Sequence, residues 1–297
     1  MVSFKKMDLT HLIGQDIGSS TLLEEIARGN MGAVFVGYQG SLKRKIAIKV
    51  LPKSVMTPRN ARLFQQEAEL AAILSHPNII PVYEVGDAGN FLFLSMQLVK
   101  GKPLSYHIKR SRKNPLPSRR ILPLKMTFSI IISVLNALDY AHSQSIIHRD
   151  IKPANILIDS YDNRPVIVDF GLARANHETG SVTVGTPLYM APEQITDPDV
   201  DGRADIYSTA TMLLEMLTPI PLFQNIRSAK ELVRKKIERR EKLFLKRPSE
   251  LNPALTKDMD RILSRALAFG PADRYATCRE FREELEQYSR HFYSKQE

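Results

Sequence analysis

Residues 146–155 read IIHRDIKPAN, and residues 166–171 read VIVDFG. Residues 156–158 and 166–168 are two short apolar runs. The turn that joins them contains Asp162, Asn163 and Pro165, so the sequence predicts an antiparallel hairpin. At its open end the hairpin would bring Asn155 and Asp169 together. An amide oxygen beside a carboxylate suits Mg²⁺, which favours few protein ligands plus substrate phosphates. Asp150 lies just upstream and is placed to accept a proton.

A second pair of charges is expected in the first third of the chain. Lys49 interrupts the apolar run IAIKVL, and a lysine inside a buried strand is costly unless its charge is paired. On the helix expected next, Leu63, Leu70 and Leu74 form an apolar stripe that contains Glu67. Lys49 and Glu67 therefore predict each other as an ion pair. The alternative is that both side chains extend to solvent.

A glycine-containing loop precedes these charges. Residues 26–34 read IARGNMGAV, and the glycines would let the backbone approach a phosphate group closely. The stretch departs from G-x-G-x-x-G at its first position, which is Ala27. On its own the loop is equally well interpreted as an ordinary hairpin turn.

The order of expected elements divides the chain in two. Strands are expected at 22–26, 33–38, 45–51, 79–85 and 91–98, and a helix from Pro58, capped by Thr57, to about Ser75. After Gly101 the pattern becomes helical, with long apolar helices at 124–142 and 205–217 and helical spacing near the C-terminus. The sequence thus predicts a small sheet lobe, a short connector and a larger helical lobe.

Composition narrows the setting. The chain has 297 residues, which suits one large domain or two coupled lobes. Its single cysteine, Cys278, excludes an intramolecular disulfide and favours a cytoplasmic location. The N-terminus has no signal-peptide core, and the longest apolar run, 128–138, is too short to span a bilayer. No membrane anchor is expected, and the sequence makes no prediction of oligomeric state.

The net charge of +10 permits two interpretations: a nucleic-acid or membrane partner, or a basic enzyme with a cleft for a polyanionic nucleotide. The sequence contains no basic motif with interleaved aromatics, so the second is preferred and no specific nucleic-acid partner is expected. The densest basic runs are 109–113 and 234–242. The second run contains glutamates and predicts a solvated helix face.

Together these motifs resemble the eukaryotic-like protein kinase superfamily, over about Leu22 to Tyr288. The glycine loop, the lysine of IAIK, HRD with Lys152 and Asn155, DFG, and APE at 191–193 occur in the family's order. The stretches HPNII and GTPLYM look most like the bacterial serine/threonine branch. Lys152, together with Thr186 in the Gly-Thr-Pro stretch, also favours serine or threonine over tyrosine as the acceptor.

The resemblance implies a bilobal α+β kinase fold. Its expected limits are an N-terminal extension at 1–20, an N-lobe at 21–96, a hinge at 97–101, a C-lobe at 102–290 and a tail at 291–297. In the C-lobe, Asp205 would lie on the buried helix that anchors the catalytic loop, and Arg274 would pair with Glu193.

The resemblance also implies a set of functional residues, with ATP and Mg²⁺ as cofactors. Lys49, held by Glu67, would bind the α- and β-phosphates, and Lys152 would sit by the γ-phosphate. Asp150 would orient the attacking hydroxyl and take its proton, and Asn155 and Asp169 would hold Mg²⁺. The phosphate loop would comprise Ala27, Arg28, Gly29, Asn30, Met31, Gly32 and Ala33. The adenine pocket would comprise Ile26, Val34, Ala47 and Leu157, with Met96 at its back and Gln97, Leu98 and Val99 offering backbone hydrogen bonds.

Regulation is expected in the segment between Asp169 and the APE motif. In relatives with an Arg-Asp pair, a phosphate on this segment binds the arginine, here Arg149. The expected sites are Thr183 first, then Ser181 or Thr179, while Thr186 would bond the catalytic loop. The alternative is a short segment that orders without phosphate.

Other functions stay open at this point. A pseudokinase that binds nucleotide without turnover would need to lack Lys49, Asp150 or Asp169, and all are present. A small-molecule kinase would share the Asp and Asn pattern, but usually lacks the GTPLYMAPE stretch that builds a platform for a polypeptide. The expected partners are therefore ATP and protein substrates with serine or threonine.

Overall fold

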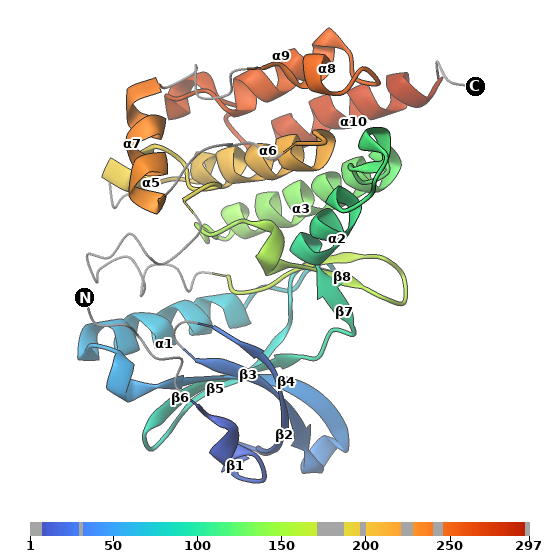
Figure 1. Ribbon diagram of the computed structural model, residues 1–297. Helices are drawn as coiled ribbons and strands as arrows, with labels where there is room; N and C mark the ends of the chain where they lie inside the picture. The colour runs from blue at the N-terminus through green and yellow to red at the C-terminus, as the bar shows by residue number, and fades with distance from the viewer. Residues whose placement is uncertain are drawn as a thin grey trace.

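The computed structural model describes residues 8–29, 32–170, 187–196, 200–220, 228–239 and 246–294. Within them, a β-sheet lobe carrying one long helix lies beneath a larger lobe of helices, as Figure 1 shows. The two-lobed α+β arrangement expected from the sequence is confirmed.

The N-terminal lobe is a six-stranded antiparallel sheet in the order β1-β2-β3-β4-β6-β5. Its strands are β1 (Asp16–Ile17), β2 (Ser20–Arg28), β3 (Ala33–Gln39), β4 (Arg44–Pro52), β5 (Val82–Ala88) and β6 (Phe91–Gln97). Side chains alternate between faces along β4. Ile48 and Val50 pack into the core on one face, and Ala47 and Leu51 pack on the other. Lys49 shares the face of Ala47 and Leu51.

The segment before β2 belongs to the sheet lobe. Leu9 and Leu12 are 2% exposed and pack with Ile17, Leu22 and Phe35 in one apolar cluster, and β1 pairs with β2. Residues 8–20 of the expected N-terminal extension thus pack on the sheet lobe, and the expected domain limits stay predictions. The apolar residues of this segment cover a sheet face that would otherwise meet water.

Helix α1 (Pro58–Ala72) packs against this sheet (Figure 1). The Thr57 side chain accepts a hydrogen bond from the Asn60 N–H at 3.2 Å, which caps the helix as expected. The helix ends at Ala72, three residues before the expected limit. Its buried face includes Phe64, Glu67 and Ala71, whereas Leu70, which was expected in the buried stripe, is half exposed.

The C-terminal lobe is built around three helices, α3 (Leu124–Ser143), α6 (Arg203–Leu217) and α10 (Cys278–Ser294), which pack on one another. Every residue of α6 after Arg203 is buried, as its apolar sequence predicts. By length and composition α3 could cross a membrane, but it is half buried in this core. The other helices are α2 (Leu104–Arg112), α5 (Glu193–Thr196), α7 (Ala229–Arg239), α8 (Pro248–Leu251) and α9 (Lys257–Ala266).

A second, three-stranded sheet lies at the junction of the lobes. It comprises β7 (Gly101–Pro103), β8 (Ile156–Asp159) and β9 (Pro165–Ile167), all antiparallel. β8 and β9 form the expected hairpin, with Ile156 opposite Ile167. Immediately before β8, the Asn155 carbonyl accepts a hydrogen bond from the Val168 N–H at 2.9 Å. The hairpin therefore holds the backbone of Asn155 beside the residue that precedes Asp169.

Candidate active site

The glycine loop joins β2 to β3 at the edge of the sheet lobe. The Gly29 N–H donates to the Gly32 carbonyl at 2.9 Å, and Ala27 pairs with Val34 across the strands. A Cβ atom on Gly32 would lie 2.1 Å from the Val50 carbonyl oxygen, so only glycine fits there without a shift of backbone. Ala27 lies within the strand and is not among the described residues of positive φ, so its methyl group imposes no backbone strain. Asn30 and Met31 lie outside the described residues.

Arg28 in this loop is tied to acidic groups of its own lobe. Its Nε donates to Glu25 Oε1 at 2.6 Å, and its Nη2 lies 3.0 Å from Asp8 Oδ1. The hydrogen bond to Glu25 raises the pKa of the Arg28 guanidinium further. The structure therefore joins the N-terminal segment to the glycine loop through an arginine that the sequence assigned to the nucleotide.

The central charge pair of the site joins the two lobes. Lys49 Nζ lies 2.7 Å from Asp169 Oδ1, and both side chains are only partly exposed. Burial raises the pKa of Asp169, but attraction to the Lys49 ammonium, the hydrogen bond from it and the nearby His148 and Lys152 together outweigh burial, so the pKa lies below its ordinary value. The carboxylate is thus held in its charged form, which is the form a metal ion requires.

The expected Lys49–Glu67 ion pair is not formed in this structure. Among the described residues, the only carboxylate within 4.0 Å of the Lys49 ammonium is that of Asp169. Glu67 is buried on α1, as the sequence predicted. The helical spacing of the apolar residues predicts that Glu67 lies on the buried face of α1. It does not predict the distance between α1 and β4. Asp169 reaches the ammonium from the other lobe instead.

The catalytic-loop residues form a compact group around one carboxylate. Asp150 Oδ2 accepts hydrogen bonds from Lys152 Nζ at 2.6 Å and from Asn155 Nδ2 at 3.0 Å. Asn155 Nδ2 also donates to the Asp150 carbonyl at 2.9 Å. These bonds fix Asp150 Oδ2, while Oδ1 makes no hydrogen bond with the described residues. A group arranged in this way can accept a proton at Oδ1.

The backbone of this loop is anchored to α6 by Asp205. The Asp205 carboxylate is fully buried and accepts hydrogen bonds from the His148 N–H at 2.9 Å and the Arg149 N–H at 2.8 Å. Burial opposes its ionisation, but the hydrogen bond with His142 and the attraction of His142 and His148 together outweigh burial and lower the pKa of Asp205. Asp205 therefore anchors the loop as the sequence predicted.

Two residues at the centre of the site adopt a left-handed backbone. Arg149 has φ 66° and Asp169 has φ 62°, a region that residues other than glycine rarely occupy. Each is held from both sides. Arg149 is bonded through its N–H to Asp205 and through its carbonyl to Gln194, and Phe170 beside Asp169 packs on the His148 ring at 4.7 Å. These contacts offset the strain and aim the Asp169 carboxylate at β4.

An apolar cluster is formed by residues of β3, β4, β9 and the hinge. Val34, Ala47, Met96, Leu98 and Val99 pack in one cluster, as expected for an adenine site. Ile26 is half exposed and outside the cluster, and the partly buried Leu157 pairs with the cluster residue Val166. The Gln97 N–H already donates to the Pro81 carbonyl at 3.0 Å, so of its backbone groups only the carbonyl could serve a base.

Three residues of this cluster were not predicted from the sequence. They are Ile80, Val166 and Val168, which belong to the same cluster. Their one signal in the sequence is their position beside the motifs: Val166 and Val168 lie in the run that directly precedes DFG, and Ile80 ends the stretch HPNII. Ile80 comes close because its N–H donates to the Ile167 carbonyl at 3.0 Å, a contact between distant parts of the chain.

The residues fit a sparse magnesium site. Asp169 is charged and Asn155 is placed beside it by the hairpin, as described above. Clusters of three or more His, Cys, Asp or Glu side chains do not occur among the described residues. Magnesium bound between few protein ligands and a triphosphate matches this donor set. Binding by Asn155 and Asp169 stays a prediction.

The APE motif at 191–193 is firmly held. Arg274 donates to both oxygens of Glu193, at 2.6 and 2.8 Å, and its side chain is fully buried. The expected pairing of these two residues is confirmed. Gln194 adds a contact that sequence reasoning missed, because its amide accepts from the Ala191 N–H and donates to the Arg149 carbonyl, each at 2.8 Å. The motif is thereby tied to the catalytic loop.

The expected regulatory residues are not placed. Thr179, Ser181, Thr183 and Thr186 lie outside the described residues, and only Arg149 of that group is described.

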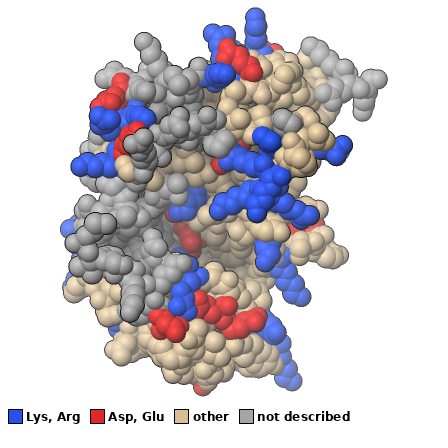
Figure 2. All heavy atoms as spheres, viewed as in Figure 1, with Lys and Arg blue, Asp and Glu red and all other residues tan. Residues whose placement is uncertain are grey.

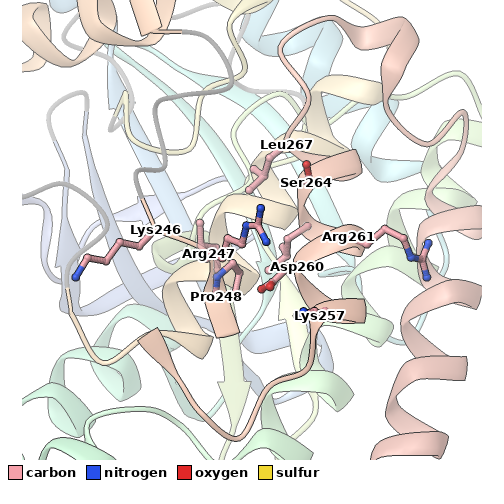
Figure 3. A pocket seen from close by; sticks show the side chains of 10 residues that line it. Lys246, Arg247, Pro248, Lys257, Asp260, Arg261, Ser264 and Leu267 are labelled. Atoms are coloured by element: carbon pink, nitrogen blue, oxygen red, sulfur yellow. The ribbon is translucent and has the colours of Figure 1, made fainter. Parts of the chain in front are cut away.

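Two further surface features lie outside the candidate site: a group of basic side chains and a cavity. Figure 2 shows Lys and Arg side chains gathered on one flank of the helical lobe, and α2 carries Lys109, Arg110 and Arg112 in its last turn. A separate cavity of about 380 Å³ lies where the end of α6 meets α8 and α9, with Lys257 and Arg261 at its rim (Figure 3). Its lining includes none of the candidate site residues.

The chain is similar to a family model and to bacterial protein kinases. Residues 20–287 match the model of the protein kinase domain. The serine/threonine-protein kinase PknF of Mycobacterium tuberculosis is 34% identical over 277 residues, which cover 90% of this chain and 56% of PknF. The tyrosine-protein kinase MasK of Myxococcus xanthus is 32% identical over 92% of this chain and 43% of MasK. This chain thus spans about half the length of these relatives.

A solved structure gives the same result for the fold. The crystal structure of a mutant PknI kinase domain from Mycobacterium tuberculosis superposes with a TM-score of 0.74 at 30% identity. The alignment covers 95% of this chain and all of that domain.

Proposed function

The chain belongs to the protein kinase family, and we propose that it transfers the γ-phosphate of Mg-ATP to serine or threonine hydroxyls of proteins. One observation carries the proposal: Lys49 and Asp169 meet at the lobe junction, and the Asp150–Lys152–Asn155 group lies on the loop whose backbone pairs beside Asp169. A partly buried cation, two acids and an amide are the groups that phosphoryl transfer needs for positioning and charge neutralisation.

The residues divide the work as follows. Magnesium, when bound, neutralises charge on the phosphates, and Asn155 and Asp169 are the residues that would hold it. Lys49 contributes its ammonium to the phosphates from β4. Asp150 is held at Oδ2 by Lys152 and Asn155, so its Oδ1 orients the acceptor hydroxyl and takes the proton.

Serine and threonine are proposed as acceptors because Lys152 bonds Asp150 and because PknF carries that name. MasK, named as a tyrosine kinase, makes tyrosine the competing outcome. Incubation with labelled ATP, Mg²⁺ and a basic protein acceptor, followed by phosphoamino-acid analysis, tests the proposal. Label on serine or threonine supports it. Label on tyrosine alone, or no label, contradicts it, and no label favours a pseudokinase.

We also propose autophosphorylation at Thr183, or at Ser181 or Thr179. Support comes from Arg149, whose backbone is fixed next to Asp150 by Asp205 and Gln194 and which would receive the phosphate. Phosphopeptide mapping after incubation with Mg-ATP tests this, and an active protein with no phosphate between Thr179 and Thr183 contradicts it.

A cytoplasmic location, with ATP and protein substrates as partners, completes the proposal. The single cysteine supports it, because Cys278 is buried and burial raises its pKa well above the ordinary value, which suits a structural thiol. Fractionation of cells that express the native gene tests the location.

A further inference from the structure

One lysine holds the segment 188–190 from behind. Lys236 Nζ donates to the Leu188 carbonyl at 2.7 Å and also to the Met190 carbonyl. Residues 187–189 lie in a turn, which brings these two carbonyls to a single ammonium. The donor comes from α7, and the acceptors directly precede the APE motif.

The placement of Lys236 differs from what its sequence suggests. It lies in the basic run 234–242, for which a solvated helix face was expected, but it is 1% exposed. Burying an ammonium is costly unless its donors are satisfied. Here two carbonyls receive the donors and the Tyr207 ring lies 5.1 Å away. Burial lowers the pKa of Lys236 to about 7.

The segment that Lys236 holds is coupled to the catalytic loop. Between its two acceptors, the Tyr189 carbonyl accepts a hydrogen bond from Ser208 Oγ of α6 at 2.9 Å. A few residues on, Gln194 bonds the Arg149 carbonyl at 2.8 Å. A shift of the segment would therefore be transmitted to the residue next to Asp150. All three consecutive carbonyls of 188–190 are bonded to side chains of the helical lobe, so the segment is fixed in position from α6 and α7.

We propose that Lys236 is a positioning residue for the polypeptide substrate. By holding the 188–190 backbone it sets the surface on which a serine- or threonine-containing peptide lies relative to Asp150. This inference rests on the proposed kinase function. It makes α7 part of the substrate platform, whereas nucleotide binding depends on β2, β3, β4 and the hinge.

The test compares Lys236→Met with Lys235→Met. Methionine keeps an unbranched stem but has no donor, and Lys235 is the neighbouring lysine, paired with Glu231 at 2.7 Å on the same helix. Two rates are measured: phosphorylation of a basic serine/threonine acceptor peptide, and hydrolysis of ATP without peptide. For Lys236→Met we expect kcat/KM for the peptide to fall about tenfold or more, mainly through KM, because charged hydrogen bonds are lost. ATP hydrolysis and the KM for ATP should match Lys235→Met.

Each outcome decides the matter. Peptide kinetics in Lys236→Met equal to those of Lys235→Met overturn the inference, as does an equal loss of peptide phosphorylation and ATP hydrolysis, which marks a merely structural role. If Lys236→Met does not fold, Lys236→Gln decides by the same two rates, because its shorter amide cannot reach both carbonyls. A wild-type protein that hydrolyses ATP but labels no peptide overturns the proposed function, and the role of Lys236 with it.

Discussion

Lys49 and Asp169 are 120 residues apart in sequence, yet their charged atoms lie 2.7 Å apart and join strand β4 to the loop after β9. The pair links the two lobes directly at the site of the proposed reaction. Any change that removes one partner leaves the other charge partly buried and alone, which is costly.

Asp169→Ala is expected to abolish phosphate transfer while leaving the fold intact. The substitution removes the carboxylate assigned to the metal and leaves the Lys49 ammonium without its partner. Labelled-phosphate transfer and circular dichroism together check this. Normal turnover in Asp169→Ala would show that the magnesium assignment is wrong.

Asp150→Asn is expected to lower kcat by about 10²–10⁴-fold, the usual contribution of a positioned acid or base. The amide preserves size but cannot take the hydroxyl proton. The measured quantity is kcat rather than the KM for ATP, because Asp150 bonds Lys152 and Asn155, which are assigned to the γ-phosphate and to Mg²⁺. Asp162→Asn, at an exposed turn, is the matched control. Equal kcat values for the two variants would refute the role of Asp150.

Gly32→Ala is expected to raise the KM for ATP and to lower stability. The new Cβ would lie 2.1 Å from the Val50 carbonyl oxygen, and backbone cannot yield cheaply, so the loop between β2 and β3 must shift. Gly40→Ala is the control, since no atom lies within 4 Å of the Cβ it would add. Nucleotide titrations of both variants check the prediction, which fails if their affinities agree.

Arg274→Ala is expected to destabilise the fold by about 3–5 kcal/mol, because it removes a fully buried guanidinium that bonds both oxygens of Glu193 and three backbone carbonyls. Arg279→Ala, which removes a mostly exposed partner of Asp139, should cost about 1 kcal/mol or less. Urea denaturation of the two variants measures the difference. Similar midpoints would mean that the Glu193–Arg274 pair adds little to stability.

The buried Lys236 predicts a specific pH dependence of stability. Its pKa is about 7 in the fold and 10.5 for an ordinary lysine. Between these values the unfolded chain binds a proton that the folded chain does not, so stability rises with pH across that window and is flat below about 7. The free energy of unfolding of the wild type relative to Lys236→Met should therefore grow between pH 7 and 9, by on the order of 1 kcal/mol per unit. If the difference in the free energy of unfolding between the two proteins stays constant from pH 6.5 to 9, the pKa of Lys236 is not lowered by burial.

Local patterns were sufficient for many elements. The cap at Thr57 and the hairpin of β8 and β9 depend on neighbouring residues, and both formed as expected. The buried helix α6 followed from apolar residues on all its sides. The N-terminal segment was the exception among local patterns, because the burial of Leu9 and Leu12 requires a sheet face that is assembled from later residues.

The sequence by itself determined the kinds of groups in the site and their order along the chain, because motif residues and their spacing are local properties. It also showed that Lys49 needed a carboxylate. Only the tertiary structure decided that Asp169 supplies it rather than Glu67, and that Lys236 turns inward to the 188–190 carbonyls rather than outward to water. Both choices depend on distances between elements remote in sequence, and periodicity within one helix or strand carries no such distance.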